Sequence, residues 1–516
     1  MNGAEALTRE LLAGGVDICF ANPGTSEMHF VAALDRFDAM RPVLCLFEGV
    51  ATGAADGYGR MTDRPAATLM HLGFGLSGGL ANLHNARKAK SPIVNIVGDH
   101  ASWHKDTGSA LVSDVAALAQ PMSDWVYQSS AACEVATDAA SAIAAAKSRG
   151  GQVATLILPA DIAWSEGGRP SVGVSSPVAS RIDHRAVESA TAALRGDAPV
   201  MLVLGARALR AGPLETAGRI ANATGARLVT PYGVGRLERG AGRAVVERLP
   251  AMIDPARKVF SGIRHVILAG ADPPAAMFAY PEKPRSMADE GTVFHALCDD
   301  PALAPDALEA LCDALGARKN KALIASRTAI DIPVGKLTPD VILQTVAATM
   351  PDHSIIVDES ISAGRNFFPL SEGAGPHDYL QLSAGALGNG IPAALGAALA
   401  CPERPVINLE GDGSAMYTLQ GLWTQAREAV NVTTIIFSNR RYNILDAELK
   451  NVGISDNVGI RARQMLSLDA PDIGWVDLAR GFGLNGERVS DAGRLATLIA
   501  AAATRQGPFL IEAMLP

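Results

Sequence analysis

Short apolar runs alternate along most of this chain with stretches whose apolar residues recur every three or four positions. The short runs predict buried strands, and the periodic stretches predict amphipathic helices. In residues 1–165 the expected strands are Ile18–Phe20, Val43–Phe47, Ala66–His71, Ile93–Val97 and Ala154–Leu158, and the expected helices are Gly3–Ala13, Met28–Phe37, Ala51–Met61 and Gly79–Lys88. Regular alternation of strand and helix is typical of a parallel α/β sheet.

Two further segments repeat this pattern. The second has expected strands at Val200–Leu204, Arg227–Val229, His265–Leu268 and Thr292–Ala296. A Gly/Pro/Ser-rich tract at 165–180 predicts a linker before it, and a basic, polar stretch at 318–327 precedes the third segment. The predicted fold class is α/β, with three doubly wound parallel-sheet domains at 1–165, 182–325 and 335–516.

The stretch 406–445 adds chemistry to the pattern. A strand at Val406–Leu409 breaks at Gly411-Asp412-Gly413, one continuous helical pattern follows, and a strand at Val432–Phe437 ends before Asn439. Both strands of a βαβ unit end at the sheet edge where ligands bind, so Asp412 and Asn439 should lie close together. Carboxylate and amide oxygens suit Mg²⁺, and the glycines let the backbone approach phosphates. An ordinary turn with a capping Asp is the alternative.

This motif, GDG followed by an Asn after the next strand, resembles the metal–diphosphate motif of thiamine-diphosphate-dependent enzymes. The local sequence (GDGSAMYTLQGLWTQA…NRRYNIL) is most similar to the acetolactate synthase and benzoylformate decarboxylase branch. The resemblance implies pyrimidine-binding, middle and diphosphate-binding domains, in chain order. It implies Mg²⁺ binding by Asp412, Asn439 and the main-chain carbonyl of Arg441, and cofactor contacts from Gly411, Gly413 and Ser414. Ser438 departs from the family, which usually has Asn there.

Three residues of the first domain are candidates for catalysis. Glu48 ends an apolar strand, where a carboxylate needs a partner; it either caps the next helix or, as the resemblance implies, hydrogen-bonds the aminopyrimidine ring of thiamine and so promotes removal of the C2 proton. Thr25, in the turn Asn22–Glu27, is either a helix cap or a substrate contact. His71 is either structural or, by resemblance, transfers a proton to or from the cofactor-bound adduct.

Further residues are expected around the substrate. The resemblance places Leu387 between the two rings of thiamine, although a plain core position is the alternative. Asp358-Glu359-Ser360 is expected to face the diphosphate or the substrate. Gly270–Phe278 lacks the second catalytic histidine of benzoylformate decarboxylase, which argues against that activity itself. Glu448 stands where an aromatic residue would favour a benzoyl group, so its charge favours a smaller or more polar substrate unless it points to solvent.

Composition narrows the functional classes. The 516 residues carry a net charge of −8 and no long basic run, which argues against nucleic-acid binding. The six scattered cysteines fit free thiols in a reducing compartment. The amino terminus lacks the pattern of a signal peptide, and no uncharged apolar run reaches the roughly 18 residues of a membrane span. A cytoplasmic protein without a membrane partner is expected.

The predicted function is thiamine-diphosphate- and Mg²⁺-dependent cleavage or formation of a carbon–carbon bond on a 2-oxo acid, by decarboxylation, acetolactate-synthase-like carboligation, or both. The resemblance implies a homodimer at minimum and a homotetramer as the expected assembly, and it leaves FAD open. A 2-hydroxyacyl-CoA lyase and a catalytically silent member of the fold are alternatives. An NAD-dependent dehydrogenase would use Gly73–Gly78 as a G-x-G-x-x-G fingerprint, with Asp99 following at tolerable spacing.

Overall fold

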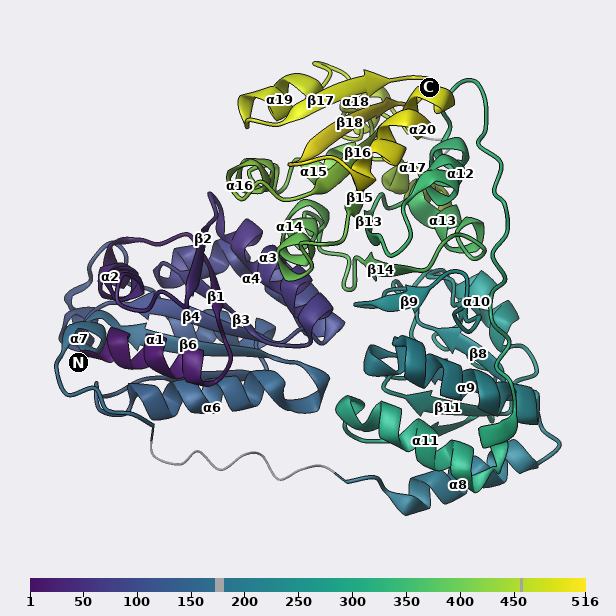
Figure 1. The fold of residues 1–516 in the computed structure, drawn as a ribbon, viewed down its shortest axis with the longest axis horizontal. Helices are drawn as coiled ribbons and strands as arrows, with labels where there is room; N and C mark the ends of the chain where they lie inside the picture. The colour runs from purple at the N-terminus through teal and green to yellow at the C-terminus, as the bar shows by residue number, and fades with distance from the viewer. Residues whose placement is uncertain (172–180, 455–457) are drawn as a thin grey trace.

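The computed structural model describes residues 1–171, 181–454 and 458–516. Three α/β units follow one another along the chain (Figure 1). Most of the expected linker, residues 172–180, lies outside the described residues. All three units have a mainly parallel sheet, as predicted.

The first unit has a six-stranded parallel sheet in the order β2-β1-β3-β4-β6-β5. Its strands are β1 Ile18–Ala21, β2 Arg41–Leu44, β3 Ala66–Met70, β4 Ile93–Asp99, β5 Trp125–Gln128 and β6 Val153–Pro159. Its helices are α1 Gly3–Ala13, α2 Met28–Leu34, α3 Glu48–Thr62, α4 Leu72–Ala89, α5 Val115–Ala119, α6 Val135–Lys147 and α7 Ala160–Trp164. The sequence pattern did not reveal β5, which is short and only half-buried.

Two predicted boundaries in this unit are wrong. Strand β2 ends at Leu44, so Glu48 opens α3 instead of closing a strand. An acidic side chain in the first turn is favourable because the helix amino terminus carries partial positive charge. Helix α4 begins at Leu72, so Gly73–Gly78 lies inside the helix and does not form the phosphate-binding turn of a dinucleotide fingerprint.

The middle unit has a five-stranded parallel sheet in the order β10-β8-β7-β11-β12. Its strands are β7 Val200–Leu204, β8 Arg227–Thr230, β10 Glu247–Arg248, β11 His265–Ala269 and β12 Val293–Ala296. Its helices are α8 His184–Arg195, α9 Ala211–Thr224, α10 Ile253–Phe260 and α11 Ala304–Ala314. The four predicted strands are confirmed to within a residue at each end.

The third unit has a seven-stranded sheet in the order β17-β18-β16-β15-β13-β14-β9. Its strands are β13 Ile355–Glu359, β14 His377–Gln381, β15 Val406–Gly411, β16 Val432–Ser438, β17 Asn485–Val489, β18 Phe509–Met514 and β9 Leu237–Arg239. Its helices are α12 Pro339–Thr349, α13 Phe367–Leu370, α14 Gly390–Ala400, α15 Asp412–Ala415, α16 Gly421–Arg427, α17 Asn443–Asn451, α18 Ile460–Gln464, α19 Trp475–Gly481 and α20 Ala492–Ala500. The single helix expected after the GDG turn is two, α15 and α16, with exposed Met416 between them.

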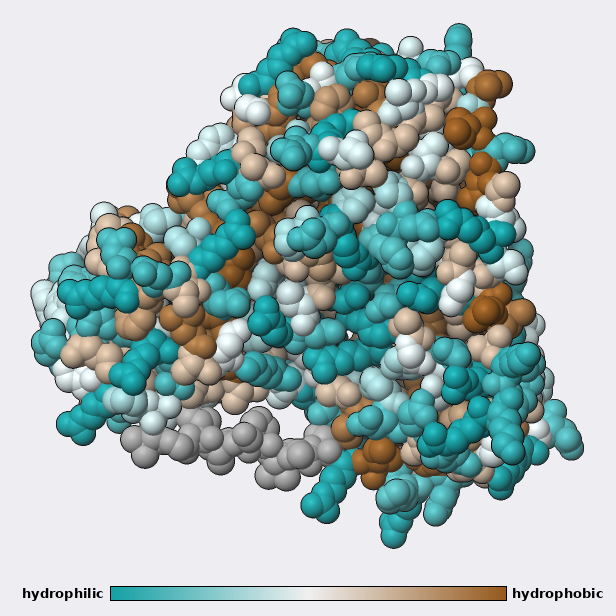
Figure 2. Space-filling model, in the orientation of Figure 1, coloured by the Kyte–Doolittle hydropathy of each residue, from teal (hydrophilic) through white to brown (hydrophobic). Residues whose placement is uncertain are grey.

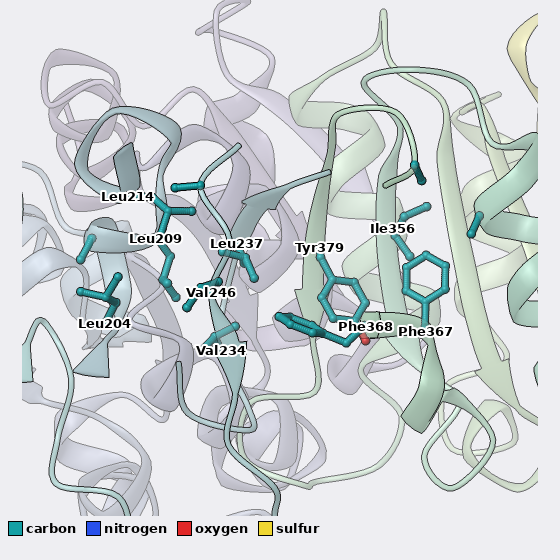
Figure 3. Packing of buried hydrophobic residues seen from close by; sticks show 14 of the residues in the cluster. Leu204, Leu209, Leu214, Val234, Leu237, Val246, Ile356, Phe367, Phe368 and Tyr379 are labelled. Atoms are coloured by element: carbon teal, nitrogen blue, oxygen red, sulfur yellow. The ribbon is translucent and has the colours of Figure 1, made fainter. Parts of the chain in front are cut away.

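Strand β9 comes from the middle segment but pairs antiparallel with β14 of the third sheet. Its Leu237 is fully buried between the cores of the two units. Figure 3 shows Leu237 between the middle-unit aliphatic residues and Tyr379, Phe367 and Phe368 of the third unit. The second and third units therefore share one continuous hydrophobic core.

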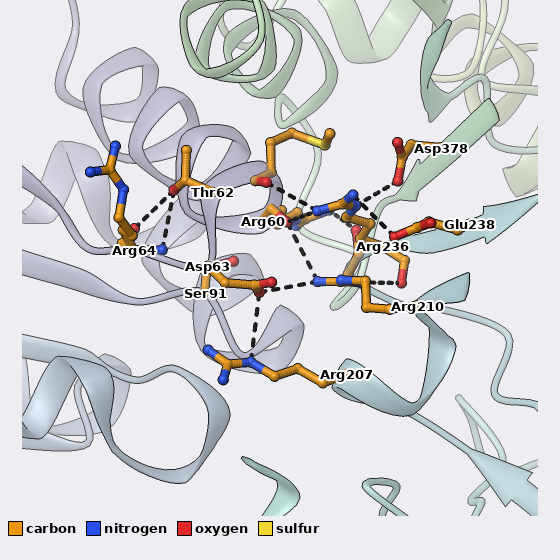
Figure 4. A network of polar contacts seen from close by, with 12 residues as sticks. Arg60, Thr62, Asp63, Arg64, Ser91, Arg207, Arg210, Arg236, Glu238 and Asp378 are labelled. Carbon is orange, nitrogen blue, oxygen red and sulfur yellow. Dashed lines mark hydrogen bonds and ion pairs between the residues drawn. The ribbon is translucent and has the colours of Figure 1, made fainter. Parts of the chain in front are cut away.

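A polar network joins all three units (Figure 4). Arg236 donates to the Met61 carbonyl at 3.0 Å and to the Asp378 carboxylate at 2.5 Å. Arg210 donates to Asp63, which lies at the end of α3, at 3.2 Å. Asp378 is buried, so its charge needs guanidinium partners, and both Arg236 and Arg404 donate to it.

Helices α3 and α14 pack the first unit against the third through close backbone contact. A Cβ at Gly57 would lie 2.1 Å from the Ala393 carbonyl oxygen, and one at Gly396 would lie 1.9 Å from that of Ala54. Asn82 of α4 donates to the carbonyls of Gly49 and Gly388, at 2.8 and 2.9 Å. These contacts fix the orientation of the first and third sheets. Among the described residues, no helix is long and apolar enough to span a membrane.

Candidate active site

The carboxyl edge of the first sheet gathers side chains from three loops. Asn22 follows β1, Glu48 follows β2 and His71 follows β3. Asn22 donates its side-chain N–H to Glu48 Oε1 at 3.0 Å. The parallel strand order therefore brings Glu48 and His71 to one edge of the sheet.

Two glycines of α4 make room for the Glu48 carboxylate. A Cβ at Gly78 would lie 2.8 Å from Glu48 Oε2, and one at Gly75 would lie 3.2 Å from Oε1. Contacts under 3.0 Å require a neighbour to shift, so Gly78 has the tighter constraint. The glycine-rich run is explained by close packing of α3 on α4 beside this carboxylate.

His71 lies immediately before α4, and its ring contacts two residues that sequence reasoning missed. Its Nδ1 is 2.9 Å from Glu27 Oε2 and 2.9 Å from Ser26 Oγ. The Glu27 carboxylate also accepts from the Gly24 N–H at 2.8 Å. The acidic residue three positions after Gly24, at the start of a short helix, was the available signal.

The capping interpretation of Thr25 is not what the structure shows. The 3₁₀ turn η1, Thr25–Glu27, has Gly24 at its N-cap position, and Glu27 satisfies the Gly24 N–H. Thr25 is exposed and, within the described part of the chain, its hydroxyl makes no hydrogen bond. The hydroxyl is therefore free to contact a ligand.

The carboxyl edge of the third sheet brings Asp412 against the loop after β16. The Asp412 carboxylate accepts from the main-chain N–H groups of Gly413 at 2.8 Å and Arg440 at 2.5 Å. Burial raises the pKa of Asp412, and the N–H groups of Arg440, Gly413 and Asn439 lower it. The predicted proximity of Asp412 and the Asn439 loop is confirmed.

The loop itself is shaped for close approach. A Cβ at Gly413 would lie 2.4 Å from the Tyr442 ring, so glycine is required there, whereas one at Gly411 would lie 3.2 Å from the nearest atom, Ser414 Oγ. Asn439 Oδ1 accepts from the Arg441 N–H at 3.0 Å. A cavity of about 650 Å³ lies beside Asn439 and Arg441.

Leu387 lies in a turn held from several sides. Its neighbour Gly388 donates its N–H to Glu359 at 2.7 Å, and its carbonyl accepts from Thr418 at 3.0 Å. Leu387 is only partly buried, outside the hydrophobic core, so the plain core interpretation is wrong. Glu359 is fully buried beneath this turn and does not face the site edge, contrary to expectation.

Glu448, on α17, contacts the middle unit. Its Oε2 accepts from Tyr280 Oη at 3.1 Å and from Asn451 Nδ2 at 3.0 Å. Glu448 therefore does not simply point to solvent, because a middle-unit tyrosine is its hydrogen-bond partner.

Comparison with known proteins identifies the family. The N-terminal TPP binding domain of thiamine pyrophosphate enzymes matches residues 1–119, and the C-terminal TPP binding domain matches residues 364–513. A Mycobacterium tuberculosis protein named "Putative acetolactate synthase large subunit IlvX" is 47% identical over 517 residues, covering 100% of this chain and 99% of that protein. The chain belongs to the thiamine pyrophosphate enzyme family.

Other members of the thiamine pyrophosphate enzyme family align over nearly the whole chain. Benzoylformate decarboxylase of Pseudomonas aeruginosa is 27% identical over 528 residues, covering 96% of each chain. The solved thiamine diphosphate-dependent 4-hydroxybenzoylformate decarboxylase of Rhodococcus jostii RHA1 superposes with a TM-score of 0.85 at 25% identity, covering 99% of both chains. The predicted family, fold class and thiamine diphosphate cofactor are confirmed.

Proposed function

We propose that this thiamine pyrophosphate enzyme uses Mg²⁺ to cleave or form a carbon–carbon bond beside the carbonyl of a 2-oxo acid. The observation that carries the proposal is the Asp412 carboxylate, buried at a sheet edge and held by the N–H of Arg440 in the Asn439 loop. Relatives whose names specify decarboxylation of 2-oxo acids, or acetolactate synthesis, support the substrate class.

Mg²⁺ would be held by Asp412, Asn439 and the main-chain carbonyl of Arg441. The donor set fits because all three are hard oxygen ligands and a buried carboxylate needs a cation partner. Gly411, Gly413 and Ser414 form the adjoining turn, where glycine would let the main chain come close to the diphosphate. This half of the site would bind the cofactor and orient it.

The first unit would supply the groups that move protons. Thiamine diphosphate supplies a carbon nucleophile and an electron sink when bound. Glu48 would hydrogen-bond the cofactor's aminopyrimidine, and Leu387 would support its bent conformation. His71 would give or take a proton at the reacting carbon, and the exposed Thr25 hydroxyl would contact substrate. Decarboxylation would leave a proton on the reacting carbon, and carboligation would join that carbon to a second carbonyl compound.

The substrate would be smaller or more polar than benzoylformate. Gly270–Phe278 provides no histidine from the middle unit, and Tyr280 and Glu448 place polar atoms between that unit and α17. A hydrogen-bonded polar pair offers a benzoyl ring less apolar surface than an aromatic side chain at position 448 would. Aliphatic and polar 2-oxo acids would therefore fit best beside Tyr280 and Glu448.

A second copy of the chain would complete the site. Large apolar side chains are exposed near both sheet edges: Leu46, Phe74 and Trp103 in the first unit, and Met416, Tyr417 and Leu445 in the third. Figure 2 shows apolar surface where the first and third units meet. Exposed apolar clusters mark protein interfaces. We therefore infer a homodimer in which the first-sheet edge of one chain meets the third-sheet edge of the other. Two such dimers would form a homotetramer.

Calorimetry with thiamine diphosphate, with and without Mg²⁺, tests the proposal. Binding is expected to require the metal and to be lost after treatment with a chelator. A panel of 2-oxo acids would then be screened for CO₂ release and for carboligation products. Binding that ignores Mg²⁺, or absence of CO₂ release and of product from every 2-oxo acid, would contradict the proposal.

A further inference from the structure

We propose that Glu27 is a positioning residue that fixes the tautomer of His71, so that Nε2 is the atom that exchanges a proton with the reacting carbon. The inference rests on the proposed function, because it specifies how the His71 ring would be oriented for that reaction.

Glu27 is built as an acceptor. It is 3% exposed, and its carboxylate accepts from Gly24 N–H at 2.8 Å, from the Ser26 hydroxyl, and from His71 Nδ1 at 2.9 Å. An ionised carboxylate has no proton to donate, so Nδ1 must carry the hydrogen. In the neutral ring the lone pair is then on Nε2.

The ring and the carboxylate have little freedom to rearrange. A Cβ at Gly24 would lie 2.1 Å from the His71 ring, and one at Gly98 would lie 1.7 Å from Glu27 Oε1. Phe74 packs edge-on against the imidazole, with ring centroids 5.0 Å apart. The His71 ring and the Glu27 carboxylate therefore fill the space that a side chain at Gly24 or Gly98 would take. This close packing restricts how the two groups can move relative to each other.

Two variants test the contact between Glu27 and His71. Glu27→Gln keeps an acceptor for Nδ1–H but removes the charge, whereas Glu27→Ala removes both. Solid-state ¹⁵N NMR of protein labelled at histidine, with His71→Asn to assign the signal, reads the tautomer without any activity. The wild type and Glu27→Gln should carry the proton on Nδ1, and Glu27→Ala should show a mixture.

Kinetics of the same variants provide a second readout. With cofactor binding unchanged, kcat should fall by roughly tenfold in Glu27→Gln and by roughly a hundredfold in Glu27→Ala, with little change in KM. Glu134→Gln is the control and should behave as wild type, because the Glu134 carboxylate accepts a hydrogen bond from the exposed Ser130, away from the site.

A neutral His71 ring with its proton on Nε2 and none on Nδ1 in the wild type would overturn the inference, even if Glu27→Ala fails to fold. So would a Glu27→Ala enzyme that binds cofactor and keeps kcat within about threefold of wild type. If thiamine diphosphate does not bind the wild type, the proposed function fails while the tautomer measurement still stands on its own. The two failures are therefore distinguishable.

Discussion

The two sheet edges that would form the active site are built differently. In the first unit, Glu48 and His71 are held by side chains, Asn22 and Glu27, from other loops. In the third unit, Asp412 is held by main-chain N–H groups of Gly413 and Arg440. The first edge therefore depends on how helices pack, and the third depends on local loop backbone. We expect the first to control proton movement and the third to control cofactor binding.

Asp412→Ala should have the largest effect. Metal-dependent binding of thiamine diphosphate should weaken by more than about a hundredfold, because even residues that only support metal ligands are worth roughly 10–100-fold. Calorimetry measures the loss. Asp477→Ala, on the surface of the same unit, should bind as wild type. Equal binding by Asp412→Ala would refute the assigned role of the third edge.

Glu48→Gln should separate the two edges. Proton exchange at C2 of bound thiamine diphosphate should slow by roughly a hundredfold or more, while cofactor affinity stays within about threefold of wild type. Exchange into deuterated water, followed by proton NMR, gives the rate. A variant that loses both cofactor binding and C2-proton exchange would show that the two edges do not have separate functions.

Gly413→Ala tests whether the turn of the third edge requires glycine next to the Tyr442 ring. The added methyl meets Tyr442, so we expect about 1–3 kcal/mol of destabilisation and weaker metal-dependent binding. Gly411→Ala is the matched control, because its methyl meets no atom closer than 3.2 Å. Thermal denaturation measures the loss of stability in both variants. Equal losses at the two positions would be inconsistent with the described turn.

Glu359→Gln tests the buried support of the Leu387 turn. Burial raises the pKa of Glu359 from 4.5 to about 7, against hydrogen bonds from Gly390 and Gly388. Between these values the unfolded chain loses the proton that the folded chain keeps. Wild-type stability should therefore fall as pH rises through this window, by at most ~1.4 kcal/mol per pH unit. Denaturant unfolding should show a shallower fall in the variant; an unchanged slope would assign the titration elsewhere.

Tyr280→Phe should have the smallest effect. It removes one hydrogen bond to Glu448, worth about 0.5–1.5 kcal/mol, so KM should rise roughly two- to tenfold with kcat nearly unchanged. Steady-state kinetics on the best 2-oxo acid measures the change in KM, and Tyr127→Phe, which alters an exposed side chain on β5, is the control. A fall in kcat alone would place Tyr280 in the chemistry instead.

Sequence reasoning succeeded where chemistry and spacing are local. Asp412 and Asn439 follow adjacent parallel strands, and that order alone brings them to one edge. It missed Glu27 because the His71 contact spans 44 residues and depends on how the η1 turn packs under α4. It missed β9 because three residues carry too little pattern and pair with a strand about 140 positions away.

The sequence by itself determined the α/β class, the family motif and the residue types at both edges, because strand and helix periodicity and the GDG spacing are local properties. Tertiary structure decided that Glu48 opens a helix, that Gly75 and Gly78 lie against its carboxylate, and that Glu27 orients His71. Those features arise from contacts between distant segments, and no periodicity encodes them.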